Sequence, residues 1–233
     1  MTAPSELISQ ARKAGRAALD EQAGKALLAA YGIAVPRAVV VGGAAEINGV
    51  LAGLTAPVAV KVISPDILHK SDAGGVKVNL RTAAEVADAI RVMMQQPAIA
   101  QARIDGFLIE EMAPAGQEIV IGGLRDADFG PLVMVGLGGI FVEVLADVAF
   151  RICPITRVDA EGMLAELKGA AILQGARGRK PVPTAAIIDT LLKVGGDDGL
   201  LMRHADEIKE ADINPLIVSD SGAVAVDARF ILT

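Results

Sequence analysis

The sequence contains few of the residues on which whole classes of protein depend. Its 233 residues include one cysteine, one tyrosine, five phenylalanines, two histidines and no tryptophan. Because Cys153 is the single cysteine, the chain has no internal disulfide, which is typical of a reducing compartment. The first residues show no apolar stretch typical of a signal peptide, so we expect a cytoplasmic protein.

Basic residues and long apolar runs are also scarce. The sequence has 22 Lys and Arg against 28 Asp and Glu, a net charge of -6, which argues against a duplex nucleic acid as partner. The most hydrophobic window, 133–150, includes Glu143, Asp147 and three glycines, so we expect no membrane span. Hydrophobic residues make up 52% but aromatic residues 3%, which leaves the core to aliphatic side chains.

Hydrophobic periodicity predicts an α+β chain. A helical pattern begins at Asp20 and ends at Gly32, where a left-handed cap residue is expected. β-Branched runs bounded by Gly or Pro predict strands at 35–41, 57–63 and 74–80.

A sequence typical of a capping box at Thr82 predicts the start of a further helix. Several strands follow it, then two helices, and then a final pair of strands. We therefore expect a chain of two lobes without repeats. The expected ranges are a helical extension over 1–19, a first lobe over 20–105 and a second lobe over 106–233.

The two C-terminal strands, ADINPLIV and AVAVDARFI, are joined by the turn-forming stretch SDSG. A turn centred on SDSG pairs Asn214 with Asp227 and Asp212 with Arg229, and opposed side chains of antiparallel strands share one face. Asn214 and Asp227 offer two hard oxygen ligands, which suit a Mg²⁺ ion that keeps waters and shares substrate phosphates. A solvated face with an Asp–Arg ion pair explains the same pattern, so both interpretations stay open.

Two further stretches carry candidate binding residues. Lys61 lies in the apolar run VAVKV, where a lysine either reaches solvent or pairs with an anion. The stretch EEMAPAGQE leaves one strand and enters the next with Glu110, Glu111, Met112 and Glu118. Taken alone, it is more typical of an ordinary acidic loop than of a binding site.

The segment SPDILHKSDAGGV contains His69 between a proline and two glycines. A structural histidine in a loop is the commoner case, and His204, the other histidine, is expected on a helix surface. No second His or Cys stands at the spacing of a zinc site, and no Ser or Cys nucleophile has an evident base. The chemistry left to His69 is covalent, because an imidazole nitrogen can take up a phosphoryl group and pass it on.

Taken together, these stretches resemble the ATP-grasp β subunit of ADP-forming acetyl-CoA (acyl-CoA) synthetases, relatives of succinyl-CoA synthetase. The resemblance runs from about residue 20 to the end and is carried by VAVKV, SPDILHKSDAGGV, GLRDADFGP, GLGGIFVE, ADINPLIV and VDAR. It implies an α+β ATP-grasp fold whose two α/β lobes hold ATP or ADP between them. The implied contacts are Lys61 for the phosphates, Glu110, Glu111, Met112 and Ala113 for adenine, Glu118 for the ribose, and Asn214 and Asp227 for Mg²⁺.

The resemblance also gives the lone histidine a role. Family members convert acyl-CoA, ADP and phosphate reversibly into carboxylic acid, CoA and ATP through an acyl phosphate and phosphohistidine. His69 is then a second phosphohistidine on a swinging segment, whose hinge is framed by Pro65, Gly74 and Gly75. The CoA site and the first phosphohistidine belong to an α region that this sequence lacks, which implies a hetero-oligomer with an α subunit.

Two alternatives remain at this point. Another ATP-grasp ligase that joins a carboxylate to an amine needs no histidine relay, so the segment around His69 would have no use in it. A non-catalytic nucleotide-binding regulatory subunit is the second alternative. The joint presence of Lys61, His69, Asn214 and Asp227 argues against loss of activity.

Overall fold

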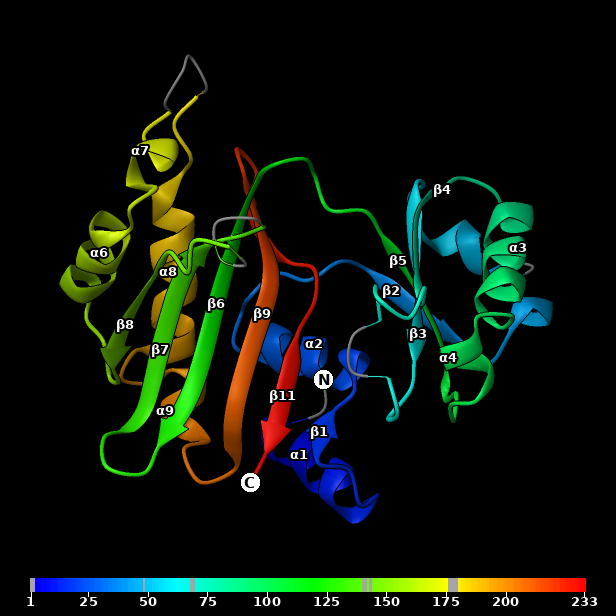
Figure 1. The fold of residues 1–233 in the computed structure, drawn as a ribbon, viewed down its shortest axis with the longest axis horizontal. Helices are drawn as coiled ribbons and strands as arrows, with labels where there is room; N and C mark the ends of the chain where they lie inside the picture. The colour runs from blue at the N-terminus through cyan, green and yellow to red at the C-terminus, as the bar shows by residue number, and fades with distance from the viewer. Residues whose placement is uncertain (1–2, 48, 68–69, 140–141, 143, 176–179) are drawn as a thin grey trace. The chain divides into compact units, whose positions relative to one another are not determined.

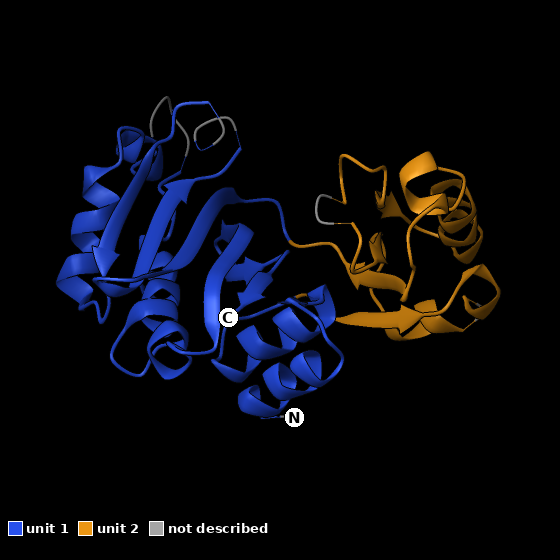
Figure 2. Ribbon diagram, turned by 60° about the horizontal axis from the view of Figure 1, so that its bottom comes forward, with its two compact units in different colours: residues 1–35, 114–233 blue, residues 36–113 orange. Residues whose placement is uncertain are grey.

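A computed structural model of the chain describes residues 3–47, 49–67, 70–139, 142, 144–175 and 180–233. It divides into two compact units, one formed by residues 36–113 and the other by residues 1–35 together with 114–233 (Figure 2). Each unit contains an antiparallel sheet and helices, which confirms the predicted α+β class (Figure 1). Within the described ranges, no helix has the length and apolar character needed to cross a bilayer.

The smaller unit is a four-stranded sheet in the order β2-β5-β3-β4 with helices beside it. Its elements are β2 (Ala38–Val41), η1 (Ala44–Glu46), η2 (Val50–Gly53), β3 (Val58–Ile63), β4 (Val76–Leu80), α3 (Ala83–Met93), α4 (Pro97–Ala100) and β5 (Gly106–Glu111).

The core of the smaller unit is formed by apolar side chains of its strands and of one face of α3. Every residue of the central strand β3 is buried, and Val60 and Val62 pack in one cluster with Ile90 of α3. The helix begins where predicted, because the Thr82 hydroxyl accepts a hydrogen bond from the Glu85 amide at 3.2 Å. This packing fixes the strand that presents Lys61.

The larger unit contains a seven-stranded sheet in the order β1-β11-β9-β6-β7-β8, with β10 paired to β9. Its elements are α1 (Pro4–Lys13), β1 (Ala18–Leu19), α2 (Glu21–Ala30), β6 (Gln117–Asp126), β7 (Gly130–Leu137), β8 (Val148–Ile152), α6 (Arg157–Glu166), α7 (Ala170–Leu173), α8 (Thr184–Gly195), α9 (Leu200–Arg203), β9 (Ile208–Ser219), β10 (Gly222–Ala225) and β11 (Arg229–Leu232).

Helices cover one face of this large sheet closely. A Cβ atom on Gly195 of α8 would lie 3.0 Å from Val133 of β7, and one on Gly123 of β6 would lie 2.6 Å from Leu201 of α9. Glycine at these positions therefore lets helix and sheet approach one another. The opposite face of the sheet bears exposed side chains, including Leu124 of β6 and Phe150 of β8.

The N-terminal segment packs in the larger unit. Asp20 caps α2 by accepting a hydrogen bond from the Ala23 amide at 2.9 Å, and Gly32 follows the end of the helix with φ +70°, both as predicted. Leu27 and Leu28 of α2 are fully buried in the core that includes Phe230 of β11. The compact units therefore have different bounds from the predicted lobes, because 20–35 packs with the large sheet and 106–113 includes a strand of the small one. The functional division into lobes stays a prediction.

The prediction that His204 lies on a helix surface is wrong. Its side chain is buried at the end of α9, where Nδ1 lies 2.6 Å from Glu207 Oε2. Its ring also makes an edge contact with the ring of Tyr31, with the centroids 6.0 Å apart. Through this ring contact, His204 joins the N-terminal segment to the end of α9. Burial also raises the pKa of the Tyr31 hydroxyl.

We predict that Leu27→Ala lowers the free energy of unfolding of the larger unit by about 2–5 kcal/mol, because it leaves a cavity in its core. Hydrogen exchange should rise in β9 and β11 more than in β3 and β5. Val92→Ala on an exposed position of α3 is the control. If faster exchange in Leu27→Ala were confined to residues 36–113, the assignment of α2 to the larger unit would be wrong.

Candidate functional site

A β-bulge in β9 determines where Asn214 points. Ile119 of β6 faces Leu216 and Ile121 faces Ile213, so Asn214 and Pro215 together oppose the single residue between them. The buried positions of β9 change from odd to even numbers across this bulge. Asn214 is exposed as a result, and bulges of this kind commonly redirect side chains beside functional sites.

Asp227 lies opposite Asn214, as predicted from the hairpin. Ala225 of β10 faces Leu216 of β9, and Arg229 of β11 faces Asp212 of β9, so the same register holds on both sides of Asp227. The predicted register of the hairpin is therefore confirmed. The Asp227 carboxylate accepts a hydrogen bond from the Ala228 amide at 2.8 Å, which orients it within the turn between the two strands.

The side chains of Asn214 and Asp227 suit a magnesium ion that shares its ligands with water and substrate, rather than a metal held by protein ligands alone. Asn214 and Asp227 supply one amide oxygen and one carboxylate, and Mg²⁺ prefers such oxygen ligands completed by water and phosphate. Among the described residues, no group of three or more His, Cys, Asp or Glu side chains could hold a metal ion. A metal bound here would take its further oxygen ligands from water or from substrate phosphates.

The predicted ribose residue, Glu118, lies at the start of β6, next to the glycines of the GLGG stretch. Its carbonyl accepts a hydrogen bond from the Gly138 amide at 2.8 Å. A Cβ on Gly138 would come within 2.7 Å of the Glu118 Cβ, and Gly139 has φ +64°. Glycines are needed here for a close approach and a left-handed turn, and the side chain of Glu118 remains exposed beside them.

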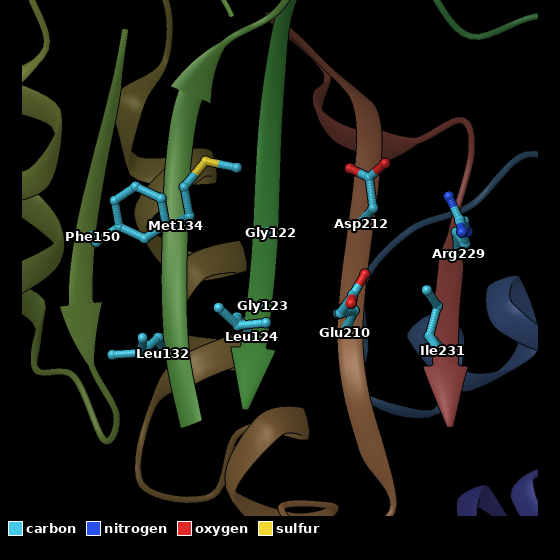
Figure 3. Close-up of a pocket in the computed structure, with 11 residues that line it drawn as sticks. Gly122, Gly123, Leu124, Leu132, Met134, Phe150, Glu210, Asp212, Arg229 and Ile231 are labelled. Atoms are coloured by element: carbon cyan, nitrogen blue, oxygen red, sulfur yellow. The ribbon is translucent and has the colours of Figure 1, made fainter. Parts of the chain in front are cut away.

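Farther along the same strands lies a depression of about 320 Å³ on the sheet face not covered by the helices (Figure 3). Two rows of facing residues cross the sheet there. The first row runs Phe150, Met134, Gly122, Asp212, Arg229, and the second runs Ile152, Leu132, Leu124, Glu210, Ile231. Sequence reasoning missed this depression, although the pair Gly122 and Gly123 within a strand was a signal for it.

In the smaller unit, Lys61 forms a buried ion pair. Its ammonium lies 2.8 Å from Glu110 Oε1, and the two residues are 5% and 1% exposed. The roles predicted for Lys61 at the phosphates and for Glu110 at adenine stay predictions. A buried ion pair is costly to break on one side only, because the remaining charge is left without compensation.

The stretch predicted to bind adenine, residues 110–113, has most of its backbone amides in hydrogen bonds. The Glu111 amide donates to the Arg37 carbonyl at 3.0 Å, and the Met112 amide donates to the Pro57 carbonyl at 3.3 Å. The Glu111 carboxylate accepts from the Thr55 amide at 2.8 Å, so this side chain braces the neighbouring loop. Of this stretch, the amide of Ala113 has no hydrogen bond among the described residues.

His69, the predicted phosphoryl carrier, lies outside the described residues. Before it, the Asp66 carboxylate accepts from the Arg103 amide at 2.7 Å, and Ile67 is buried in the core of the smaller unit. After it, the Gly75 carbonyl accepts a hydrogen bond from the Val62 amide of β3 at 2.9 Å, and Gly74 has φ +71°. The segment is thus anchored on both sides of its centre.

Comparison with known proteins finds relatives along nearly the whole chain. Residues 10–232 match the ATP-grasp domain family. The β subunit of acetate–CoA ligase (ADP-forming) I from Pyrococcus furiosus is 44% identical over 229 residues, which are 97% of each chain. Acetate–CoA ligase (ADP-forming) I of Archaeoglobus fulgidus is 42% identical over 210 residues, which are 90% of this chain and 30% of that protein. The chain thus spans all but a few residues of the first relative and a minor part of the second.

The fold also matches solved structures of acetyl-coenzyme A synthetase 1 from Ca. Korarchaeum cryptofilum. Its complex with coenzyme A and Ca-AMPCP has a TM-score of 0.93 and 41% identity, covering 99% of this chain and 100% of that one. Its complex with coenzyme A and Mg-AMPPCP has a phosphohistidine segment pointing towards the nucleotide-binding site. This complex has a TM-score of 0.84 and 40% identity, with 99% of this chain and 100% of that one covered.

We predict that Lys61→Met lowers the free energy of unfolding by about 3–5 kcal/mol, because it removes the ammonium that pairs with the buried Glu110 carboxylate. The double variant Lys61→Met/Glu110→Gln removes that charge and should recover part of the loss in urea denaturation.

Affinity for Mg-ADP, measured by calorimetry, separates a structural role of Lys61 from a phosphate-binding role. If Lys61 binds phosphate, the affinity stays low in the double variant even though its stability recovers. Wild-type affinity in the double variant would show that Lys61 serves only to balance Glu110.

Proposed function

The chain belongs to the ATP-grasp family, in the group of the β subunits of ADP-forming acetate–CoA ligases, and from this membership we propose that it forms the nucleotide site of such a ligase. The family and fold predicted from the sequence are thereby confirmed. The reaction converts acyl-CoA, ADP and phosphate reversibly into carboxylic acid, CoA and ATP.

The observation that carries this proposal is the pair formed by Asn214 and Asp227. The bulge exposes Asn214, the strand register puts Asp227 opposite it, and the hydrogen bond from Ala228 orients the carboxylate. A bound Mg²⁺ would neutralise charge on the nucleotide phosphates at this place. The Mg-AMPPCP complex of the Korarchaeum relative supports this choice of metal and nucleotide.

The remaining nucleotide contacts are proposals for side chains of both units. Lys61 would bind phosphate oxygens, Ala113 would offer its amide to adenine, and Glu118 would accept hydrogen bonds from the ribose hydroxyls. Lys61 is proposed from the family membership, whereas Ala113 and Glu118 are also supported by structure: the Ala113 amide has no hydrogen bond among the described residues, and Glu118 is exposed beside the glycine turn.

His69 is proposed to carry the phosphoryl group. The imidazole nitrogen of His69 attacks the phosphorus of the first phosphohistidine at the α site, an N–P bond forms on His69, and the N–P bond to the donor histidine breaks, which restores the donor imidazole. In the second transfer, an oxygen of the ADP β-phosphate attacks, the N–P bond breaks and the imidazole is restored. Support comes from the family membership and from the described residues on either side of His69, where Ile67 is buried and Gly75 is hydrogen-bonded to β3.

We further propose an α subunit as obligatory partner, which would supply the CoA site and the first phosphohistidine. The Archaeoglobus relative, of which this chain matches 30%, supports a partner that is fused in some proteins and separate in others. A cytoplasmic location is proposed from the lone cysteine. Burial raises the pKa of the Cys153 thiol to about 11, so this thiol is protonated and poorly reactive near neutral pH.

We predict that the purified chain, incubated with Mg²⁺ and γ-labelled ATP, acquires about one phosphate that is labile in acid and stable in base, as expected of a phosphoramidate. His69→Ala should abolish the label and leave Mg-ADP affinity unchanged. His204→Gln, which keeps a polar partner for Glu207, is the matched control and should retain the label. A labelled His69→Ala variant would contradict the relay.

We predict that Asp227→Asn weakens Mg²⁺ binding in the presence of ADP by about 10- to 100-fold, because it removes a charged metal ligand. Thermal melting should change little, since the side chain is partly exposed. Asp206→Asn, at an exposed ion pair with Arg125, is the control. An active Asp227→Asn enzyme at ordinary magnesium concentration would contradict the metal assignment.

A further inference from the structure

Arg229 lies in the depression on the open face of the large sheet, across the strands from Asp212 (Figure 3). The next residue of the same row is Gly122, which adds no side chain of its own. A Cβ there would come within 2.9 Å of Met134 Cε, so glycine keeps open the space between Asp212 and Met134. The depression therefore has room for a small ligand at Gly122, in the same row of facing residues as Arg229.

One donor of the Arg229 guanidinium, Nε, is buried and has no acceptor among the described residues. No ion pair of Arg229 is found among those residues either. Buried donors without an acceptor are rare and destabilising, which points to an anionic ligand that completes the site.

The order of residues along the strands indicates which anion this is. Glu118, proposed for the ribose, faces Ile217 at one end of β6. Asn214 and Asp227, proposed for the metal, come next, and Arg229 follows two residues after Asp227, which is about 7 Å in an extended strand. A nucleotide held in this direction would extend its terminal phosphate towards Arg229.

We propose that Arg229 binds the terminal phosphoryl group of the nucleotide and holds it for transfer. This inference rests on the proposed function. The planar guanidinium can donate two parallel hydrogen bonds to phosphoryl oxygens, which gives it both charge and direction. Asp212 faces it across the strands, and the space at Gly122 would admit the group that exchanges the phosphate.

The test compares two nucleotides on the full chain in the presence of Mg²⁺. Affinities are measured by calorimetry for ADP and for the non-hydrolysable ATP analogue AMPPCP. Arg229→Gln should weaken AMPPCP binding by about 10- to 100-fold, the range expected for lost hydrogen bonds to a charged group, and change ADP binding by less than about threefold. Arg229→Lys keeps the charge without the fork and should recover part of the affinity for AMPPCP.

Arg125→Gln, at an exposed arginine of β6, is the matched control and should change neither affinity. Equal affinities of wild type and Arg229→Gln for AMPPCP would overturn the inference, as would an equal loss for both nucleotides. Thermal melting tests whether Arg229→Gln is folded. If it is not, Arg229→Lys decides by the loss of AMPPCP affinity relative to the loss of ADP affinity. Failure of the wild-type chain to bind either nucleotide would instead contradict the proposed function.

Discussion

The bulge at Asn214 and Pro215 is the constraint on which the rest of the site depends. A strand that alternates strictly has one polar face along its whole length, whereas β9 buries Ile213 before the bulge and Leu216 after it. The extra residue lets both parts of the strand contribute to the same core while Asn214 stays exposed. The hairpin register is unshifted past this point, so the turn at SDSG, and not the bulge, puts Asp227 opposite Asn214.

The two ends of the chain stabilise this arrangement together. A Cβ on Gly24 of α2 would lie 2.9 Å from the Ala228 carbonyl, so glycine lets the N-terminal helix pack directly behind the segment that carries Asp227. Phe230, fully buried two residues further on, and the pairing of β1 with β11 hold the strand that carries Arg229. The proposed phosphate-binding residues are therefore positioned by residues about two hundred positions away in the sequence.

Local signals predicted the elements and the hairpin, and long-range contacts decided what sequence reasoning missed. The SDSG turn and the flanking alternation are local, which is why the facing of Asp212 and Arg229 was predictable. The pairing of Lys61 with Glu110 depends on two strands far apart in the chain, and the burial of His204 depends on Tyr31. Such contacts require the tertiary arrangement, so periodicity alone placed His204 on a surface. The family resemblance, in contrast, was readable because its motifs are contiguous.

The central claim is that the metal and the nucleotide phosphates lie at the level of the bulge. Mn²⁺ can replace Mg²⁺ at oxygen sites, and its anomalous scattering locates it directly in a crystal. Crystals of the chain grown with Mn²⁺ and AMPPCP should give one strong anomalous peak bonded to Asn214 Oδ1, the Asp227 carboxylate and nucleotide phosphate oxygens. A peak bonded to neither side chain, or a bound nucleotide without a peak at the hairpin, would contradict the account.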